Sequence, residues 1–166
     1  MDEWTIFFLR AVFIGVGATV VMDIYAIILK QFFSIKSLDY GILERWIGHF
    51  SHGQFYHKNI TQSTPIKGEK IIGGITHYLI GITFSALLIF IWGIEWTKNP
   101  TIFPALIIGI LTVAAPFFIM QPAFGFGIAA SKTPNPKVAR IKSLLTHSVY
   151  GVGLYLSALL LKTFFI

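Results

Sequence analysis

Four strongly polar side chains each stand inside a long apolar run of this sequence. They are Asp23 in VGATVVMDIYAIIL, His77 in GGITHYLIG, Gln121 in FFIMQPAFG and His147 in LLTHSVYGVG. Ionisable groups within a bilayer are costly and by default functional. We therefore predict a ligand-binding site made by these four residues, and the question is whether the fold brings them together.

Three of the four side chains are predicted to share one depth, measured from the nearest basic residue of each run. The separations are seven positions for Asp23 before Lys30, seven for His77 after Lys70 and five for His147 after Lys142. A helix rises about 1.5 Å per residue, which places all three about 8 to 11 Å inside the basic boundary. Gln121 is deeper on a straight helix, but Pro122 predicts irregular structure there.

Three kinds of chemistry suit a site made by these four polar side chains. Asp23, His77 and His147 offer a carboxylate and two imidazoles to a divalent metal such as zinc, with Gln121 or water completing the shell. His77 and His147 could instead hold a b-type haem from opposite corners of a bundle. A third reading is a relay in which Asp23 exchanges protons with a histidine. Residue types alone leave the three open.

A purely structural explanation competes with all three. A buried Asp23 can be protonated and bonded to Thr19 or to another helix, which would merely hold the bundle together. Each histidine taken singly can be a packing residue. The glycines of GVGAT, GGIT and GVGLY are expected to be close helix contacts, because small residues let membrane helices approach.

Composition places the chain in a membrane. Of its 166 residues 55% are hydrophobic and only 12% charged, with a mean hydropathy of +0.73. A soluble domain of this size cannot bury that much apolar surface. The net charge of +6 comes from residues that flank apolar runs, the pattern of membrane anchoring, so we expect lipid and no nucleic acid as partner. The absence of cysteine excludes disulfides and thiolate metal sites.

Length and hydropathy predict one all-α membrane domain over residues 1–166, an up-down bundle of four transmembrane helices. The expected spans are about residues 5–32, 70–94, 101–128 and 141–163. Pro104, Pro116 and Pro122 predict kinks in the third span. The long connection between the first two spans has helical apolar spacing over about residues 37–50, which predicts an interfacial helix on the cytoplasmic leaflet.

Charge predicts the orientation, since cytoplasmic loops carry the excess of Lys and Arg. The basic side would hold Lys30, Lys36, Arg45, Lys58, Lys67, Lys70, Lys132, Lys137, Arg140 and Lys142, and the other side only Arg10, Lys98 and Lys162. Both termini are therefore expected outside the cytoplasm.

The interfacial segment and its following loop carry the remaining polar candidates. Glu44 and Arg45 are expected on the wetter face of the interfacial helix. His49, His52 and His57 form a second cluster. It could bind metal, although surface histidines in loops are more often solvated.

Several segments together resemble one family. They are SLDYGILERWIGHF, GQFYH, GITHYLIG, TVAAPFFIMQP, AASKTPNP and HSVYGVGLYL, and they resemble the bacterial membrane proteins grouped as domain of unknown function 2938. The resemblance implies a multi-pass protein of the bacterial inner (plasma) membrane and lends no catalytic residue.

The sequence therefore favours a membrane protein that binds a metal ion, haem or proton in the inner half of its bundle. One alternative is a noncatalytic assembly or stabilising subunit of a larger membrane complex. Another is a small transporter acting as a homo-oligomer, because four helices alone enclose a narrow conduit. An enzyme acting on lipid or quinone, with the loop histidines as acid–base groups, is the less favoured class.

Overall fold

The computed structural model describes residues 2–35, 40–66 and 69–165, and these residues contain helices and loops but no strand. Four helical segments are long and apolar enough to cross a membrane: Glu3–Phe33, Ile71–Trp92, Ile102–Ala123 and Pro136–Phe165. The all-α, four-helix fold class predicted from hydropathy is confirmed.

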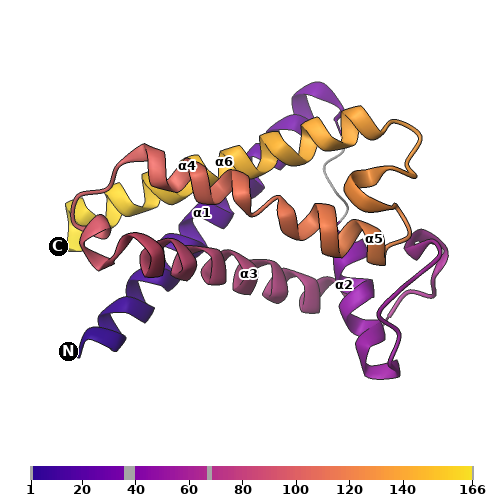
Figure 1. Ribbon diagram of the computed structural model, residues 1–166, viewed down its shortest axis with the longest axis horizontal. Helices are drawn as coiled ribbons and strands as arrows, with labels where there is room; N and C mark the ends of the chain where they lie inside the picture. Colours follow the sequence, from indigo (N-terminus) through magenta and orange to yellow (C-terminus); the bar gives the residue numbers. More distant parts are fainter. Residues whose placement is uncertain (1, 36–39, 67–68, 166) are drawn as a thin grey trace.

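The first half of the described chain contains α1 (Glu3–Phe33), α2 (Tyr40–Gly48), η1 (His49–His52), η2 (Ile60–Gln62) and α3 (Glu69–Trp92). The second half contains η3 (Ile94–Thr97), α4 (Ile102–Leu111), η4 (Pro116–Met120), α5 (Gln121–Ala123), η5 (Ile128–Ala130) and α6 (Pro136–Phe165). Figure 1 shows both termini and the α3–α4 connection at one end, and α2 with the α5–α6 connection at the other. We call this second end the basic end, because most Lys and Arg residues belong to it.

The third span is interrupted around Pro116, as predicted, whereas Pro104 lies in the first turn of the unbroken α4 (Ile102–Leu111) and makes no kink. α4 ends in a turn after Leu111, and Pro116 opens the π-helical turn η4 before the short α5. Proline has no N–H to donate, so the regular helical hydrogen-bond pattern cannot pass through it unchanged. Regular helix stops at Ala123, earlier than the expected residue 128. The helix expected over about residues 37–50 appears as α2 followed by η1, and residues 37–39 of this range lie outside the described residues.

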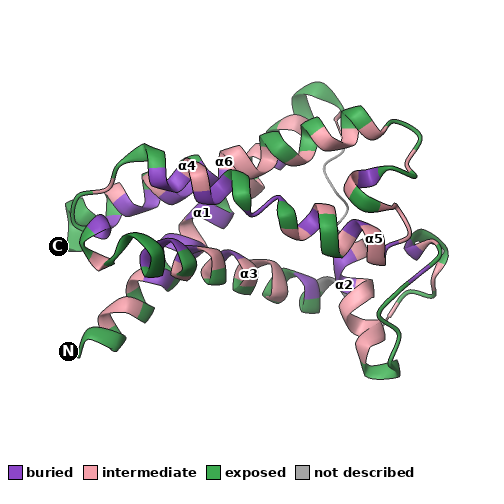
Figure 2. Ribbon diagram, viewed as in Figure 1, coloured by how far each residue is buried: buried purple, intermediate pink, exposed green. Residues whose placement is uncertain are grey.

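Glycines set the closest helix crossings. α1 packs against both α3 and α6, and α4 packs against α6. A Cβ added to Gly15 of α1 would lie 2.6 Å from the Cα of Ile82 in α3, and one added to Gly109 of α4 would lie 2.6 Å from the Cα of Gly151 in α6. The predicted close helix contacts are confirmed for Gly15 of GVGAT and Gly151 of GVGLY, whereas a Cβ on Gly74 of GGIT would meet nothing within 4 Å. Figure 2 shows buried residues concentrated along these crossings.

Two polar ties join the helices away from the basic end. Arg10 of α1 donates from Nη1 to the buried Thr97 Oγ1 at 2.6 Å, which attaches α1 to η3. The Tyr150 hydroxyl of α6 donates to the Gly81 carbonyl of α3 at 2.6 Å. Both bonds use donors that would otherwise be costly to bury. They fix how α1, α3 and α6 are rotated against one another, and hence which side chains meet at the basic end.

Candidate functional site

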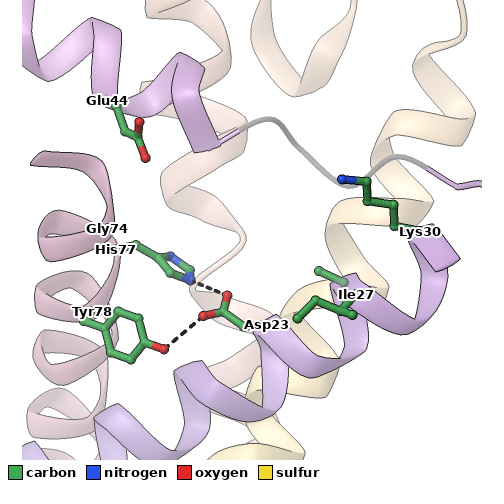
Figure 3. Close-up of a pocket in the computed structure, with 8 residues that line it drawn as sticks. Asp23, Ile27, Lys30, Glu44, Gly74, His77 and Tyr78 are labelled. Atoms are coloured by element: carbon green, nitrogen blue, oxygen red, sulfur yellow. Dashed lines mark hydrogen bonds and ion pairs between the residues drawn. The ribbon is translucent and has the colours of Figure 1, made fainter. Parts of the chain in front are cut away.

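Asp23 and His77 meet between α1 and α3. His77 Nε2 lies 3.1 Å from Asp23 Oδ1, and the Tyr78 hydroxyl donates to Asp23 Oδ2 at 3.0 Å. Figure 3 shows both α3 side chains directed at the carboxylate. An ionised carboxylate only accepts hydrogen bonds, so His77 Nε2 carries the proton in that state. The sequence prediction named Asp23 and His77 but missed Tyr78, although it is adjacent to His77.

The pair lines a pocket at the basic end. The cavity has a volume of about 350 Å³ and is lined by Asp23, Ala26, Ile27, Lys30, Glu44, Gly74, His77 and Tyr78. The Asp23 side chain is 29% exposed and that of His77 12%. The carboxylate is therefore accessible from the cavity, while the imidazole is largely enclosed by the helices.

Glu44 is a site residue that the sequence analysis misplaced. It was expected on the wet face of the interfacial helix, yet it is only 5% exposed and lines the pocket from α2. Figure 3 shows Glu44 projecting from α2 beside His77 and Gly74. A Cβ on Gly73 would overlap the Glu44 side chain, so the glycine makes room for it. The adjacent glycines Gly73 and Gly74 were the sequence signal for this contact, because a helix surface without side chains leaves room for a side chain from another helix.

His147 has a different partner. Its Nδ1 lies 2.9 Å from Thr112 Oγ1, and Thr112 in turn donates to the Gly109 carbonyl at 2.6 Å. Because the Thr112 hydrogen is used there, His147 Nδ1 is the donor to Thr112 if both bonds form together. This contact belongs to the α4–α6 crossing, whereas Asp23 and His77 belong to the α1–α3 crossing.

Gln121 is buried in α5, with 3% exposure. Its Oε1 has no hydrogen-bond partner among the described residues, and Gln121 is not part of the pocket lining. The structure therefore brings together two of the four predicted side chains, Asp23 and His77.

These placements bear first on the predicted metal site. Within the described residues no three His, Cys, Asp or Glu side chains are grouped so that they could hold a metal ion. The predicted metal set of Asp23, His77 and His147 is therefore not supported. The physical reason is that an equal depth along a helix does not specify the direction in which a side chain points. The two histidines that a haem would need are each hydrogen-bonded to a separate partner.

A strap over residues 53–64 covers the end of α5. His57 N–H donates to the Ala123 carbonyl at 2.8 Å, and Ile60 N–H donates to the Phe124 carbonyl at 3.1 Å. Phe124 is fully buried against this strap and α2. Arg45 donates to the Ser63 carbonyl at 3.2 Å, so the strap also holds α2 in position.

The loop histidines lie within this strap and η1. His57 is 2% exposed, its Nδ1 lies 2.9 Å from Ser63 Oγ, and its ring centroid lies 4.9 Å from that of His49. His52 bonds instead to its neighbour Ser51. A metal site at His49, His52 and His57, which the sequence left open, is likewise not supported among the described residues. Burial, followed by repulsion from a charged His49, lowers the pKa of His57 below its usual 6.5.

We expect the strap to lose stability as the pH falls below about 6.5. In that range an unfolded strap binds a proton on His57 and the folded one does not, so the free energy of unfolding decreases with decreasing pH. Trp46 reports the change because its Nε1 donates to the Phe55 carbonyl at 2.7 Å. The measurement is the emission difference between the protein and its Trp46→Phe variant. His57→Gln should flatten the pH dependence, whereas the exposed His52→Gln should leave it unchanged.

The fold and the site together define a small helical protein with four helices suited to a membrane and a hydrogen-bonded carboxylate–imidazole–phenol group in a pocket at its basic end. A family model described as protein of unknown function (DUF2938) matches residues 12–161. The chain belongs to this family, as its motifs predicted. Neither a curated protein nor a solved structure matches the chain.

Proposed function

We propose that this protein binds and releases a proton at the Asp23–His77 pair, within a pocket that opens at the cytoplasmic side of a bacterial inner membrane. Both termini would then face outward, following the excess of basic residues at the other end. The observation that carries the proposal is the 3.1 Å contact between the carboxylate and the imidazole, on the wall of a cavity.

A proton is the ligand that these contacts support best. The metal site predicted from the sequence needs three protein ligands and the predicted haem site needs both histidines, whereas a proton needs only a pair of groups that can share it. Asp23 and His77 supply that pair, and Tyr78 stabilises the ionised carboxylate by donating to its second oxygen. The two protonation states of the pair therefore differ by one charge inside a largely apolar bundle.

The cavity favours a functional reading over a purely structural one. A carboxylate that only held α1 to α3 would be enclosed between the helices, as Thr19 is against the Gly15 carbonyl. Asp23 instead keeps 29% of its side chain exposed in a pocket that a second carboxylate, Glu44, also lines. Its proton can therefore exchange with solvent or with a ligand.

Asp23→Asn is expected to remove one titrating carboxyl from the protein. The measurement is pH-difference infrared spectroscopy of the lipid-embedded protein between about pH 4 and about pH 9, where a protonated carboxyl gives its own C=O band. That band should vanish in Asp23→Asn. It should move to higher frequency in Tyr78→Phe, because the carboxyl loses the hydrogen bond from the phenol.

Glu95→Gln provides the control, since Glu95 is exposed and pairs with Lys98 at the opposite end of the bundle. Its loss should leave the Asp23 band unchanged. A band that survives in Asp23→Asn and is insensitive to Tyr78→Phe would refute the proposal, as would a spectrum with no carboxyl protonation assignable to Asp23.

A further inference from the structure

We propose that the pocket between α1, α2 and α3 binds a monovalent organic cation with an apolar body, in exchange for the proton on Asp23. The inference rests on the proposed proton site and adds its ligand class. It is drawn from three features of the cavity: the placement of its carboxylates, its size, and the character of its remaining walls.

The carboxylates approach the cavity from two different elements. Asp23 belongs to α1 and Glu44 to α2, and both line the same space. A carboxylate can accept about four hydrogen bonds, and Asp23 uses one on each oxygen, to His77 and Tyr78. Asp23 therefore retains acceptor capacity toward the cavity. Tyr78, also in the lining, adds an aromatic ring as a third group that attracts cations.

Size and wall chemistry favour an organic ligand over a bare ion. A volume of about 350 Å³ falls in the range of small-molecule pockets, roughly 300 to 1,000 Å³. The walls between the polar groups are made by Ala26, Ile27 and Gly74, which offer apolar contact and no side-chain ligand. The described residues hold no group of three metal ligands. An ammonium group with a hydrocarbon or aromatic body fits the two carboxylates and the apolar walls, whose attraction must exceed the repulsion from Lys30 in the same lining.

Competition between the cation and the proton follows from the shared carboxylate. Among the described residues, the charged and titratable groups of the lining are Lys30, Glu44, His77 and Tyr78 around Asp23, and α6, which also packs on α1, contributes none. Once Asp23 is protonated it no longer offers a full negative charge to a ligand. Where one proton is displaced for each cation bound, the dissociation constant rises about tenfold for each unit of decreasing pH.

Isothermal titration calorimetry in lipid nanodiscs tests the inference with benzyltrimethylammonium, a cation whose charge does not titrate. Binding should weaken as the pH is lowered, by about tenfold for each pH unit over the range in which Asp23 takes up its proton. Titrations in buffers of different ionisation enthalpy should show one proton released for each cation bound. Neopentylbenzene, the neutral carbon isostere, and benzenesulfonate, an anion of similar size, should both fail to bind.

Substitutions at two separate carboxylates test the inference, so that a folding defect in one variant does not decide the result. Asp23→Asn and Glu44→Gln should each weaken the probe at least tenfold, while Glu95→Gln should bind it normally, with helix content checked by circular dichroism. Equal binding of the neutral isostere, or no binding of the cation while the infrared carboxyl band of Asp23 is intact, would overturn the inference and leave the proton site standing. Absence of the Asp23 carboxyl band would refute both the cation site and the proton site.

Discussion

Gly15→Ala and Gly109→Ala are each expected to destabilise the bundle by about 1–3 kcal/mol, the usual cost of overpacking a close contact. The added Cβ of Gly15 would lie 2.6 Å from the Ile82 Cα and 2.9 Å from the Gly81 carbonyl oxygen. That of Gly109 would lie 2.7 Å from the His147 carbonyl oxygen. These neighbours are backbone atoms, so whole helices must move to relieve the overlap.

The measurement is thermal or denaturant unfolding of the purified protein in one detergent, followed by circular dichroism. Gly74→Ala is the matched control, because it is also a helical glycine but a Cβ there meets nothing within 4 Å. Alanine is the better helix former by about 1 kcal/mol, so this control should be neutral or stabilising. If Gly15→Ala and Gly109→Ala behave like Gly74→Ala, the close α1–α3 and α4–α6 crossings are wrong.

Gly125→Ala should detach the strap from the end of α5, for two reasons that add. Gly125 has φ +86°, a left-handed conformation that costs a residue with a Cβ about 1 to 2 kcal/mol. Its Cβ would also overlap the Lys58 carbonyl and lie 2.7 Å from the His57 carbonyl oxygen. That overlap adds about 1–3 kcal/mol. The Trp46 emission should shift toward that of a solvated indole.

Gly93→Ala separates the two causes. Gly93 has φ +82°, close to the value of Gly125, but a Cβ there meets nothing within 4 Å. It therefore carries the conformational cost without the contact with the strap, and the difference between the variants measures that contact. Equal effects of the two substitutions on Trp46 emission would show that the strap does not lie against Gly125.

The same substitution links the strap to the pocket. Arg45 of α2 donates to the Ser63 carbonyl of the strap. Glu44, which directly precedes Arg45 in α2, lines the cavity. Releasing the strap should therefore weaken the proposed cation site through Glu44. The infrared signal of Asp23 should persist, because Asp23 and His77 belong to α1 and α3, which pack on each other without the strap.

The four spans could be predicted because they depend on local composition. A stretch of about 20 apolar residues identifies a candidate helix whatever its neighbours are, and Pro116 predicts a departure from regular helix because proline lacks the donor N–H. The family could be recognised for the same reason, since its motifs are short contiguous segments. Asp23 and His77 stood out because a polar side chain in an apolar run is visible without knowledge of its partner.

The partners of these side chains were decided by the tertiary structure. Sequence distance from a basic boundary estimates depth, because helical rise is constant, and on that basis His147 seemed equivalent to His77. Rotation about the helix axis depends on which surfaces pack, and the crossings at Gly15 and Gly109 send His77 toward Asp23 and His147 toward Thr112.

Glu44 illustrates the same division between local and tertiary information. Its place on a short amphipathic helix was readable from apolar spacing, and a charged residue on such a helix is ordinarily solvated. Only the packing of α2 on α3 buries it, in the space that Gly73 leaves open. The sequence by itself determined the four apolar helices and their order. The tertiary structure decided which of their side chains face one another, because facing depends on contacts between segments that are distant in the chain.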